Sequence, residues 1–393
     1  MPTDGTSLAT TEPQERQASA RPDGPRQHRP SRLPSLTGLR FPAAFMVFVF
    51  HASLPMPLVR LLADDTVEHR FAWAVGPSGA LGVTFFFVLS GFVLTWSASD
   101  DDTAPSFWRR RYVKILPNYV VAWILAMALY AAATPLLPAL GALFMFQVWT
   151  PYFSEHLPVN PPSWSLAVEA VFYLAFPLLL AGIRRISADR LKYWIVGTVA
   201  AVFVTPLVTY QLVPAGPHVM PGTDGTSPVH YWFAYIMPLP RVLDFALGIL
   251  VARAVMLNRW RNIGMIWSGV LLAAGYVASY HVPYLYAQRA TCLIPAVTLI
   301  AAAAVADRDG RFTLFRSRAM VWLGNVSFAF YLLHFIVLAW FRKLLGTEMY
   351  GTATGVAIIA GEAVVTLLAS WALYALVEKP LTHRFSRPRR QAG

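Results

Sequence analysis

Residues 39–58 read LRFPAAFMVFVFHASLPMPL, an apolar run that carries two ionisable side chains, Arg40 and His51. The run has the roughly 20 residues that a helix needs to cross a bilayer. Arg40 and His51 are eleven residues apart. At roughly 100° per residue, this spacing places both side chains on nearly the same helix face, about 16 Å apart along the axis. Ionisable groups inside a membrane are costly, so two of them on one stripe indicate a functional site that faces protein or water.

The whole chain has the composition of a polytopic membrane protein. Of its 393 residues, 56% are hydrophobic and only 13% are charged, whereas soluble domains average about 25% charged residues. We therefore predict an all-α fold with about ten transmembrane helices. The apolar runs cover residues 39–58, 79–97, 115–133, 164–183, 193–213, 231–256, 263–279, 284–306, 321–341 and 353–376.

One further apolar run, Leu137 to Val148, is about half the length of a normal span. If it does not cross, basic loops alternate regularly with loops poor in Lys and Arg, whereas a crossing here would scatter them. We therefore predict a re-entrant or interfacial segment near residues 137–148. By the positive-inside bias, we predict that the basic loops and both termini lie in the cytoplasm. The protein is then a multi-pass protein of the plasma (inner) membrane. The basic loop residues are Arg109, Arg110, Arg111, Lys114, Arg184, Arg185, Arg190, Lys192, Arg253, Arg259, Arg261, Arg308, Arg311, Arg316 and Arg318.

These loops account for the net charge of +12. The charge is spread over several short segments without an arginine-rich groove, so we do not expect nucleic-acid binding. Residues 1–34 have the composition of a disordered basic tail rather than of a signal peptide. Residues 35–380 form the predicted transmembrane domain, whose last helix is expected to end at Pro380, and residues 381–393 form a second basic tail. The lone Cys292 lies in an apolar run, and we expect neither a disulfide nor a metal site.

Polar residues in the fourth and sixth predicted spans are candidate site residues. Ser165 and Glu169 are spaced i, i+4, so both point to one side of their helix. The alternative role of Glu169 is a structural ion pair or a favourable position near a helix N-terminus. Arg241 and Asp244 are opposite in sign and spaced i, i+3, and the favoured interpretation is an internal ion pair beside a substrate cavity.

Two further groups complete the candidates. Tyr331 and His334 share one face of the ninth predicted span, where an interhelical hydrogen bond is the alternative to a role in the site. The cluster around Arg110, Arg111 and Lys114 could clamp a nucleotide phosphate. Its alternative role is positive-inside anchoring.

Six motifs occur in order along the chain. They are Leu36-Thr-Gly-Leu-Arg40 followed by ten residues and His51, Phe85-Phe-Phe-Val-Leu-Ser-Gly-Phe92, Arg111-x-x-Lys114-x-x-Pro117, Pro162-Ser-Trp-Ser-Leu-Ala-Val-Glu169, Tyr331-Leu-Leu-His334 and Glu378-Lys-Pro380. Together they resemble the acyltransferase-3 family of integral membrane O-acyltransferases. The resemblance implies transfer of an acyl group, commonly acetyl from acetyl-CoA, to a hydroxyl on a sugar or a sugar-bearing molecule.

The resemblance also implies roles for individual residues. Arg40 and His51 are then the central pair, and Arg111 with Lys114 belongs to a basic motif on the donor side. The family usually has arginine where this chain has Lys114. That departure keeps the positive charge but loses the two-pronged fork with which arginine holds phosphate.

Acyl transfer from a thioester to an alcohol requires a base, and histidine titrates near the working pH. We predict that His51 is the general base and that Glu169 is its orienting or acidic partner. The chain has no Gly-x-Ser-x-Gly motif, so direct transfer is expected rather than an acyl-enzyme. The predicted substrate-binding residues are Arg40, Ser165, Arg241, Asp244, Tyr331 and His334, and the residues predicted to hold the acyl-CoA donor are Arg110, Arg111 and Lys114.

The acceptor is predicted from a narrower resemblance. Within the family, the chain most resembles the actinomycete enzymes that acylate a hydroxyl of macrolide antibiotics, so a macrolide is the first expectation. A cell-surface polysaccharide or a lipid-linked glycan is the alternative acceptor. A proton-coupled transporter is an alternative of a different class, although no internal repeat of the kind common in transporters is visible.

Overall fold

The computed structural model describes residues 1, 32–152, 155 and 157–385, and this part of the chain is built from helices. The first seven cover Pro34–Ala52 (α1), Asp65–Ser97 (α2), Ala104–Ala126 (α3), Leu136–Leu143 (α4), Trp164–Arg184 (α6), Leu191–Leu212 (α7) and Pro228–Tyr231 (α8). The next seven cover Pro238–Met256 (α9), Gly264–Ala278 (α10), Tyr284–Arg289 (α11), Leu293–Arg308 (α12), Arg318–Leu345 (α13), Thr352–Leu373 (α14) and Lys379–Phe385 (α15). The all-α prediction is confirmed. Most of both predicted tails lies outside the described residues.

Nine helical segments within the described ranges are long and apolar enough to cross a membrane. They correspond to nine of the ten predicted spans. The remaining predicted span is α10, a helix of 15 residues that continues into a short 3-10 turn. Fifteen residues rise about 22 Å, which is less than the roughly 30 Å of a hydrocarbon core. The polytopic helical architecture is therefore confirmed, with nine full-length helices and one shorter helix.

The loops of the bundle gather at two ends. At one end, Arg259 forms an ion pair with Asp189 at 3.2 Å, and Arg308 donates to the Asn258 side chain at 2.8 Å. Loops that the sequence analysis placed on the basic side therefore meet in space. At the other end, a parallel bridge joins Leu62 in the α1–α2 loop to Tyr350 between α13 and α14. Which side of the membrane each end faces stays a prediction.

The short run near residues 137–148 does not cross the bundle. It forms α4 and a 3-10 turn. The Trp123 indole donates to the Ala139 carbonyl at 3.1 Å, so α4 lies beside the second half of α3. The Leu137 side chain is 81% exposed, which fits contact with lipid better than contact with water. The segment thus behaves as the predicted re-entrant or interfacial element.

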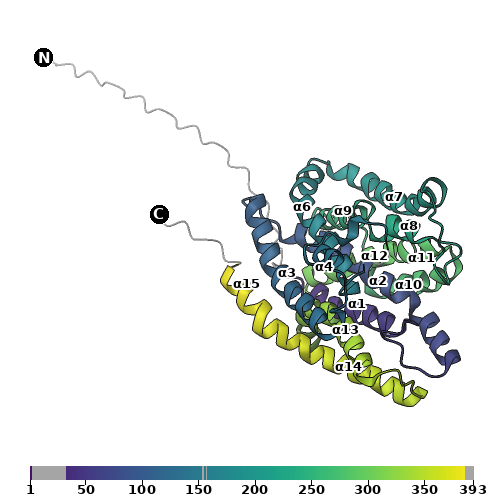
Figure 1. Ribbon diagram of the computed structural model, residues 1–393. Coiled ribbons are helices and arrows are strands. Elements are labelled where there is room, and N and C mark those ends of the chain that lie inside the picture. The colour runs from purple at the N-terminus through teal and green to yellow at the C-terminus, as the bar shows by residue number, and fades with distance from the viewer. Residues whose placement is uncertain (2–31, 153–154, 156, 386–393) are drawn as a thin grey trace.

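Helix α1 lies in the centre of the bundle, in contact with α2, α12 and α13 (Figure 1). It begins and ends about five residues earlier than the apolar run suggested. A tertiary cap accounts for the earlier start: the Asp307 carboxylate accepts hydrogen bonds from the Ser35 backbone N–H at 2.8 Å and from its hydroxyl at 2.6 Å. A carboxylate is favourable at a helix N-terminus. Both ionisable residues of the opening stretch remain inside the helix.

Helices α2 and α9 approach each other closely. A Cβ atom on Gly91 would lie 2.1 Å from the Phe245 carbonyl oxygen, and one on Gly248 would lie 2.1 Å from the Val88 oxygen. Any larger side chain would therefore push the two helices apart, as is typical of small-residue packing in membranes. This contact sets the position of the part of α2 that borders the site.

Two predicted spans are broken in the structure. The run over residues 231–256 is interrupted before Pro238, which begins α9. Because proline has no N–H, the Ala234 carbonyl loses its usual helical donor. Arg289, at the end of α11, donates to that carbonyl at 3.3 Å. The second break lies between α11 and α12. It places Arg289 where its side chain satisfies the carbonyl that the first break leaves without a donor.

The last helix extends beyond its predicted end. The helix was expected to end at Pro380. Instead, a π-helical turn over Tyr374–Glu378 leads into α15, which continues to Phe385. Pro380 is the second residue of α15 and follows the π-helical turn directly, so its missing N–H falls where the hydrogen-bond pattern of the helix already changes. Figure 1 shows α14 and α15 as one long rod along a flank of the bundle, with α3 beside α15.

Candidate active site

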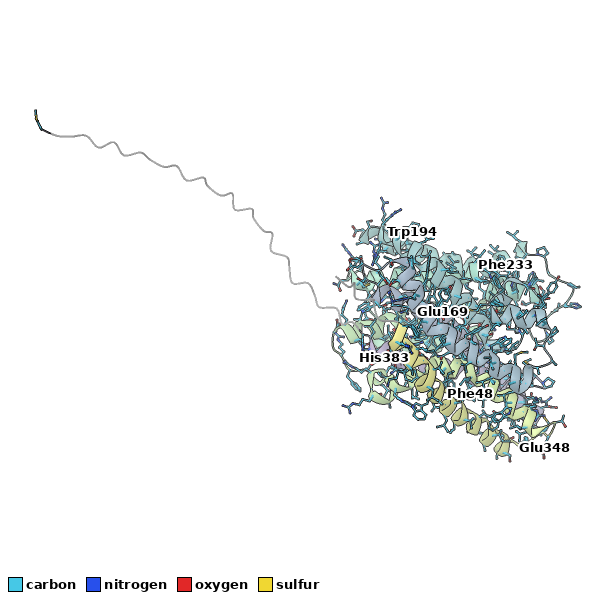
Figure 2. The ribbon with its side chains drawn as sticks, turned by 60° about the vertical axis from the view of Figure 1, so that its left-hand side comes forward. Phe48, Glu169, Trp194, Phe233, Glu348 and His383 are labelled. Carbon is cyan, nitrogen blue, oxygen red and sulfur yellow. The ribbon has the colours of Figure 1, made fainter. Side chains whose placement is uncertain are left out.

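A small cavity of about 50 Å³ lies between α1, α2, α6 and α13. Its polar wall consists of Arg40, Ser165, Glu169 and Tyr331. Its apolar and aromatic wall consists of Val83, Phe86, Phe87, Leu166 and Phe328. Figure 2 labels Glu169 in the middle of the helical body. Four residues that the sequence analysis selected from three separate spans therefore border one cavity.

The two polar residues of α6 are held by hydroxyl groups from neighbouring helices. The Ser165 and Tyr331 hydroxyls lie 2.7 Å apart, and Ser165 also lies 3.0 Å from the Pro162 carbonyl that accepts from it. One turn further on, the Glu169 carboxylate accepts a hydrogen bond from the Ser90 hydroxyl at 2.7 Å. The i, i+4 spacing thus places a neutral hydroxyl and a carboxylate on the same wall.

His51 and His334 form a pair next to this cavity. His51 Nδ1 lies 3.1 Å from His334 Nε2 and 2.9 Å from the Val47 carbonyl oxygen. His334 is fully buried, whereas His51 is half-buried. The His334 ring also meets the Tyr331 ring, with centroids 5.8 Å apart. Because Tyr331 lines the cavity, the pair is one side chain away from it.

Arg40 also belongs to a group of charged side chains with Lys114 on α3 and Glu378 in the turn before α15, all within electrostatic range of one another. Glu378 accepts a hydrogen bond from the Asn118 amide at 2.8 Å. The side chains of Arg40 and Lys114 form neither a hydrogen bond nor an ion pair within 4 Å with any other described residue. Two half-buried cations with no close partner are suited to an anionic ligand.

The three predicted donor-binding residues of α3 differ in their surroundings. Arg110 forms an ion pair with Asp102 and donates to the Ser106 hydroxyl at 2.7 Å. Arg111 instead lies over the Phe107 ring at 5.8 Å from its centroid. Arg111 and Lys114 are both within electrostatic range of Glu169. The structure therefore brings Arg111 and Lys114 towards the cavity wall, and it leaves Arg110 with partners of its own.

Arg241 and Asp244 do not line the cavity. Both are fully buried, and they form an ion pair at 2.9 Å. Asp244 also pairs with Arg289 at 3.4 Å. The Arg241 guanidinium lies over the rings of Phe87 and Tyr235, at 4.7 and 4.9 Å from their centroids. This cluster thus stands behind the aromatic wall, in the arrangement of the internal ion pair that the sequence analysis favoured.

Three partners in the site were not identified from the sequence. Ser90, which binds Glu169, stands in one of the six motifs, but its hydroxyl looks like any other serine in an apolar run. Arg289 is a lone arginine in a predicted span, and that signal alone would have been sufficient to select it. Glu378 was treated as the end of a helix, and only the packing of α3 against the last helix brings it to Asn118 and Lys114 on α3.

The chain is similar to known proteins over most of its length. A family model described as an acyltransferase domain matches residues 33–375. Acyltransferase MdmB of Streptomyces mycarofaciens is 38% identical over 371 residues, which cover 91% of this chain and 94% of MdmB. Peptidoglycan O-acetyltransferase OatA of Listeria monocytogenes is 25% identical over 347 residues, which cover 78% of this chain but only 49% of OatA. No solved structure matches.

The matched region includes every helix that borders the cavity. It begins before α1 and ends at residue 375, within the π-helical turn Tyr374–Glu378. The resemblance that six short motifs suggested is thus confirmed over most of the chain. This protein belongs to the acyltransferase-3 family.

Proposed function

We propose that this protein is a membrane O-acyltransferase that moves an acyl group, most simply acetyl, from acyl-CoA to a hydroxyl of a sugar-bearing acceptor. One observation carries the proposal: a single cavity joins Arg40, whose side chain has no close partner among the described residues, to Tyr331, which touches the histidine pair. A group transfer between two substrates requires such an arrangement, with a site for an anionic donor and a base beside one reaction space.

The donor would enter from the end that carries the basic loops. Arg111 and Lys114 would hold the nucleotide phosphates of CoA, and Arg40 would contact the arm that leads to the thioester. If the positive-inside bias holds, this end and both termini face the cytoplasm, where CoA is found. A cavity of about 50 Å³ has room for a few water molecules, so it suits a short acyl group.

The proposed reaction is a direct transfer. Neutral His51 accepts the proton of the acceptor hydroxyl, and the oxygen forms a bond to the thioester carbonyl carbon. The carbon–sulfur bond then breaks, and the CoA thiolate takes the proton from His51. Arg40, on the cavity wall, would stabilise the negative charge that develops on the carbonyl oxygen. Glu169 would orient the acceptor through the hydroxyl groups around it.

For the acceptor we propose a macrolide that carries a free hydroxyl. The support is the match to MdmB, a Streptomyces acyltransferase of which 94% is covered. By contrast, this chain spans about half the length of the peptidoglycan O-acetyltransferase that it matches. A macrolide is also apolar enough to reach a site inside the bundle through the membrane. Transfer to a cell-wall glycan would be the other outcome of the experiment that follows.

The experiment uses the full-length protein purified into lipid nanodiscs with acetyl-CoA. Macrolides with a free sugar hydroxyl and peptidoglycan fragments are offered separately, and released CoA thiol and product mass are measured. We expect acceptor-dependent CoA release with a mass gain of one acetyl group on the macrolide. His51→Ala should lower the rate at least about 100-fold, in line with the usual contribution of a general base.

The matched control is His230→Ala, which removes another buried histidine, bonded to the Val213 carbonyl at 2.9 Å and outside the cavity. It should leave the transfer rate unchanged. A His51→Ala protein that transfers acetyl at the original rate would show that the base is misassigned. A wild-type protein that releases no CoA with either acceptor class would refute the proposed reaction.

A further inference from the structure

The contacts of the histidine pair define which nitrogen of His51 carries a hydrogen. Nδ1 lies 2.9 Å from the Val47 carbonyl oxygen and 3.1 Å from His334 Nε2. A carbonyl oxygen can only accept a hydrogen bond, so His51 Nδ1 must be the donor, and its one hydrogen is shared between the Val47 carbonyl oxygen and His334 Nε2 in a three-centre bond. His334 Nε2 then faces a donor, and its lone pair is the group that accepts.

This arrangement leaves His51 Nε2 as the unprotonated nitrogen of the neutral ring. The reverse arrangement, in which His334 Nε2 donates to His51 Nδ1, would direct the Nδ1 lone pair at the oxygen lone pairs of Val47. Aromatic side chains hold the ring in its plane: Phe50 lies at 5.0 Å and Phe335 at 5.4 Å between centroids, both edge to face. The orientation of His51 is thus determined by α1 on one side and by α13 on the other.

We propose that His334 is a positioning residue, which acts with the Val47 carbonyl to hold His51 in the tautomer and ring orientation whose Nε2 can take the proton of the acceptor hydroxyl. The inference rests on the proposed function, in which His51 is the base. When Nε2 takes the proton, the Nδ1–H bond to His334 is kept, and the His334 lone pair stabilises the positive ring. The proton returns from Nε2 to the CoA thiolate, so His334 itself neither gains nor loses one.

A carboxylate has this role in Ser-His-Asp triads. Here the acceptor is a neutral imidazole with no exposed surface. A neutral group fits this place, because an isolated carboxylate would be expensive to bury among Phe48, Phe330 and Phe335, whose rings surround the pair. His334 therefore supplies a second acceptor, from another helix, beside the Val47 carbonyl, and it adds no charge to an apolar interior.

The test compares two amide variants of similar polarity, His334→Gln and His334→Asn. Both are assayed in nanodiscs with acetyl-CoA and the acceptor that the preceding experiment identifies. The glutamine amide oxygen reaches the position of Nε2 and can accept from His51 Nδ1, whereas the asparagine amide is one carbon shorter. We expect His334→Gln to keep kcat within about tenfold of the original and His334→Asn to lose on the order of 100-fold, with the KM for acetyl-CoA unchanged in both. Equal kcat values for the two variants would overturn the proposal.

A double variant separates positioning from packing. In a protein that already carries His51→Ala, the substitution His334→Asn has no base left to orient. The double variant should therefore transfer acetyl no more slowly than His51→Ala alone. Additive losses would indicate a structural role and contradict the inference. If His51→Ala abolishes transfer while His334→Asn retains the original kcat, the proposed function stands and the inference fails. His230→Gln, at the buried histidine outside the site, should retain the original kcat and serves as the control for the substitution itself.

Discussion

Two groups of buried charge in this bundle are built in opposite ways. Behind the aromatic wall, Asp244 lies between Arg241 and Arg289, and all three side chains are at most 1% exposed. Beside the cavity, Arg40 and Lys114 are half-buried and have no ion pair within 4 Å among the described residues. In the first group each arginine has an ion pair with the one carboxylate that they share, whereas in the second group the positive side chains have no such partner beside the reaction space.

This difference separates a scaffold from a binding site. A buried pair that satisfies itself contributes little net stability, but removing one partner is strongly destabilising because a bare charge remains. A cation without a close partner is a poor structural element, and in a membrane protein it is expected where a ligand supplies the missing charge. Substitutions in the first group should therefore affect folding, and substitutions in the second should affect catalysis.

The largest effect is expected from Asp244→Asn. It leaves Arg241 and Arg289 buried without a counter-charge, so the free energy of unfolding should fall by about 3–5 kcal/mol. Thermal unfolding in detergent, followed by tryptophan fluorescence, measures the loss. The matched control is Asp100→Asn at the exposed ion pair with Arg184, which should not shift the unfolding midpoint. An unchanged midpoint for Asp244→Asn would break the comparison.

Arg40→Met should act on the reaction instead. Its chain packs in nearly the same space, so the unfolding midpoint should stay close to the original. Loss of the cation on the cavity wall should lower kcat/KM for acetyl transfer about 100-fold, as loss of one oxyanion donor does. Steady-state kinetics with acetyl-CoA gives the value. A large fall in the unfolding midpoint with normal kcat/KM in the folded fraction would place Arg40 with the scaffold.

Lys114→Met should have the smallest effect of the three. Loss of one phosphate contact is expected to raise the KM for acetyl-CoA about tenfold with little change in kcat. Arg110→Met is the matched comparison on the same helix, because Arg110 is already paired with Asp102. Its effect on KM should be smaller than that of Lys114→Met. The opposite order would show that the donor binds on the Arg110 side of α3.

The main features of the fold could be predicted from the sequence because they follow from local rules. Apolar runs of spanning length located nine full helices and the shorter α10, and loop charge showed that the run near residues 137–148 does not cross. Helix bounds were less accurate where partners decide them. The start of α1 depends on Asp307, some 270 residues away in the chain, and the path of the last helix beyond Pro380 depends on α3.

The candidate site divides in the same way. The sequence by itself determined the stripe of Arg40 and His51 and the shared wall of Ser165 and Glu169, because helical periodicity is a local property. Only the tertiary structure decided that His334 meets His51, since their 283 positions of separation are closed by packing of α1 against α13. It also decided which arginines are paired, because the counter-charge of a buried cation comes from another helix, and no periodicity within one helix identifies that partner.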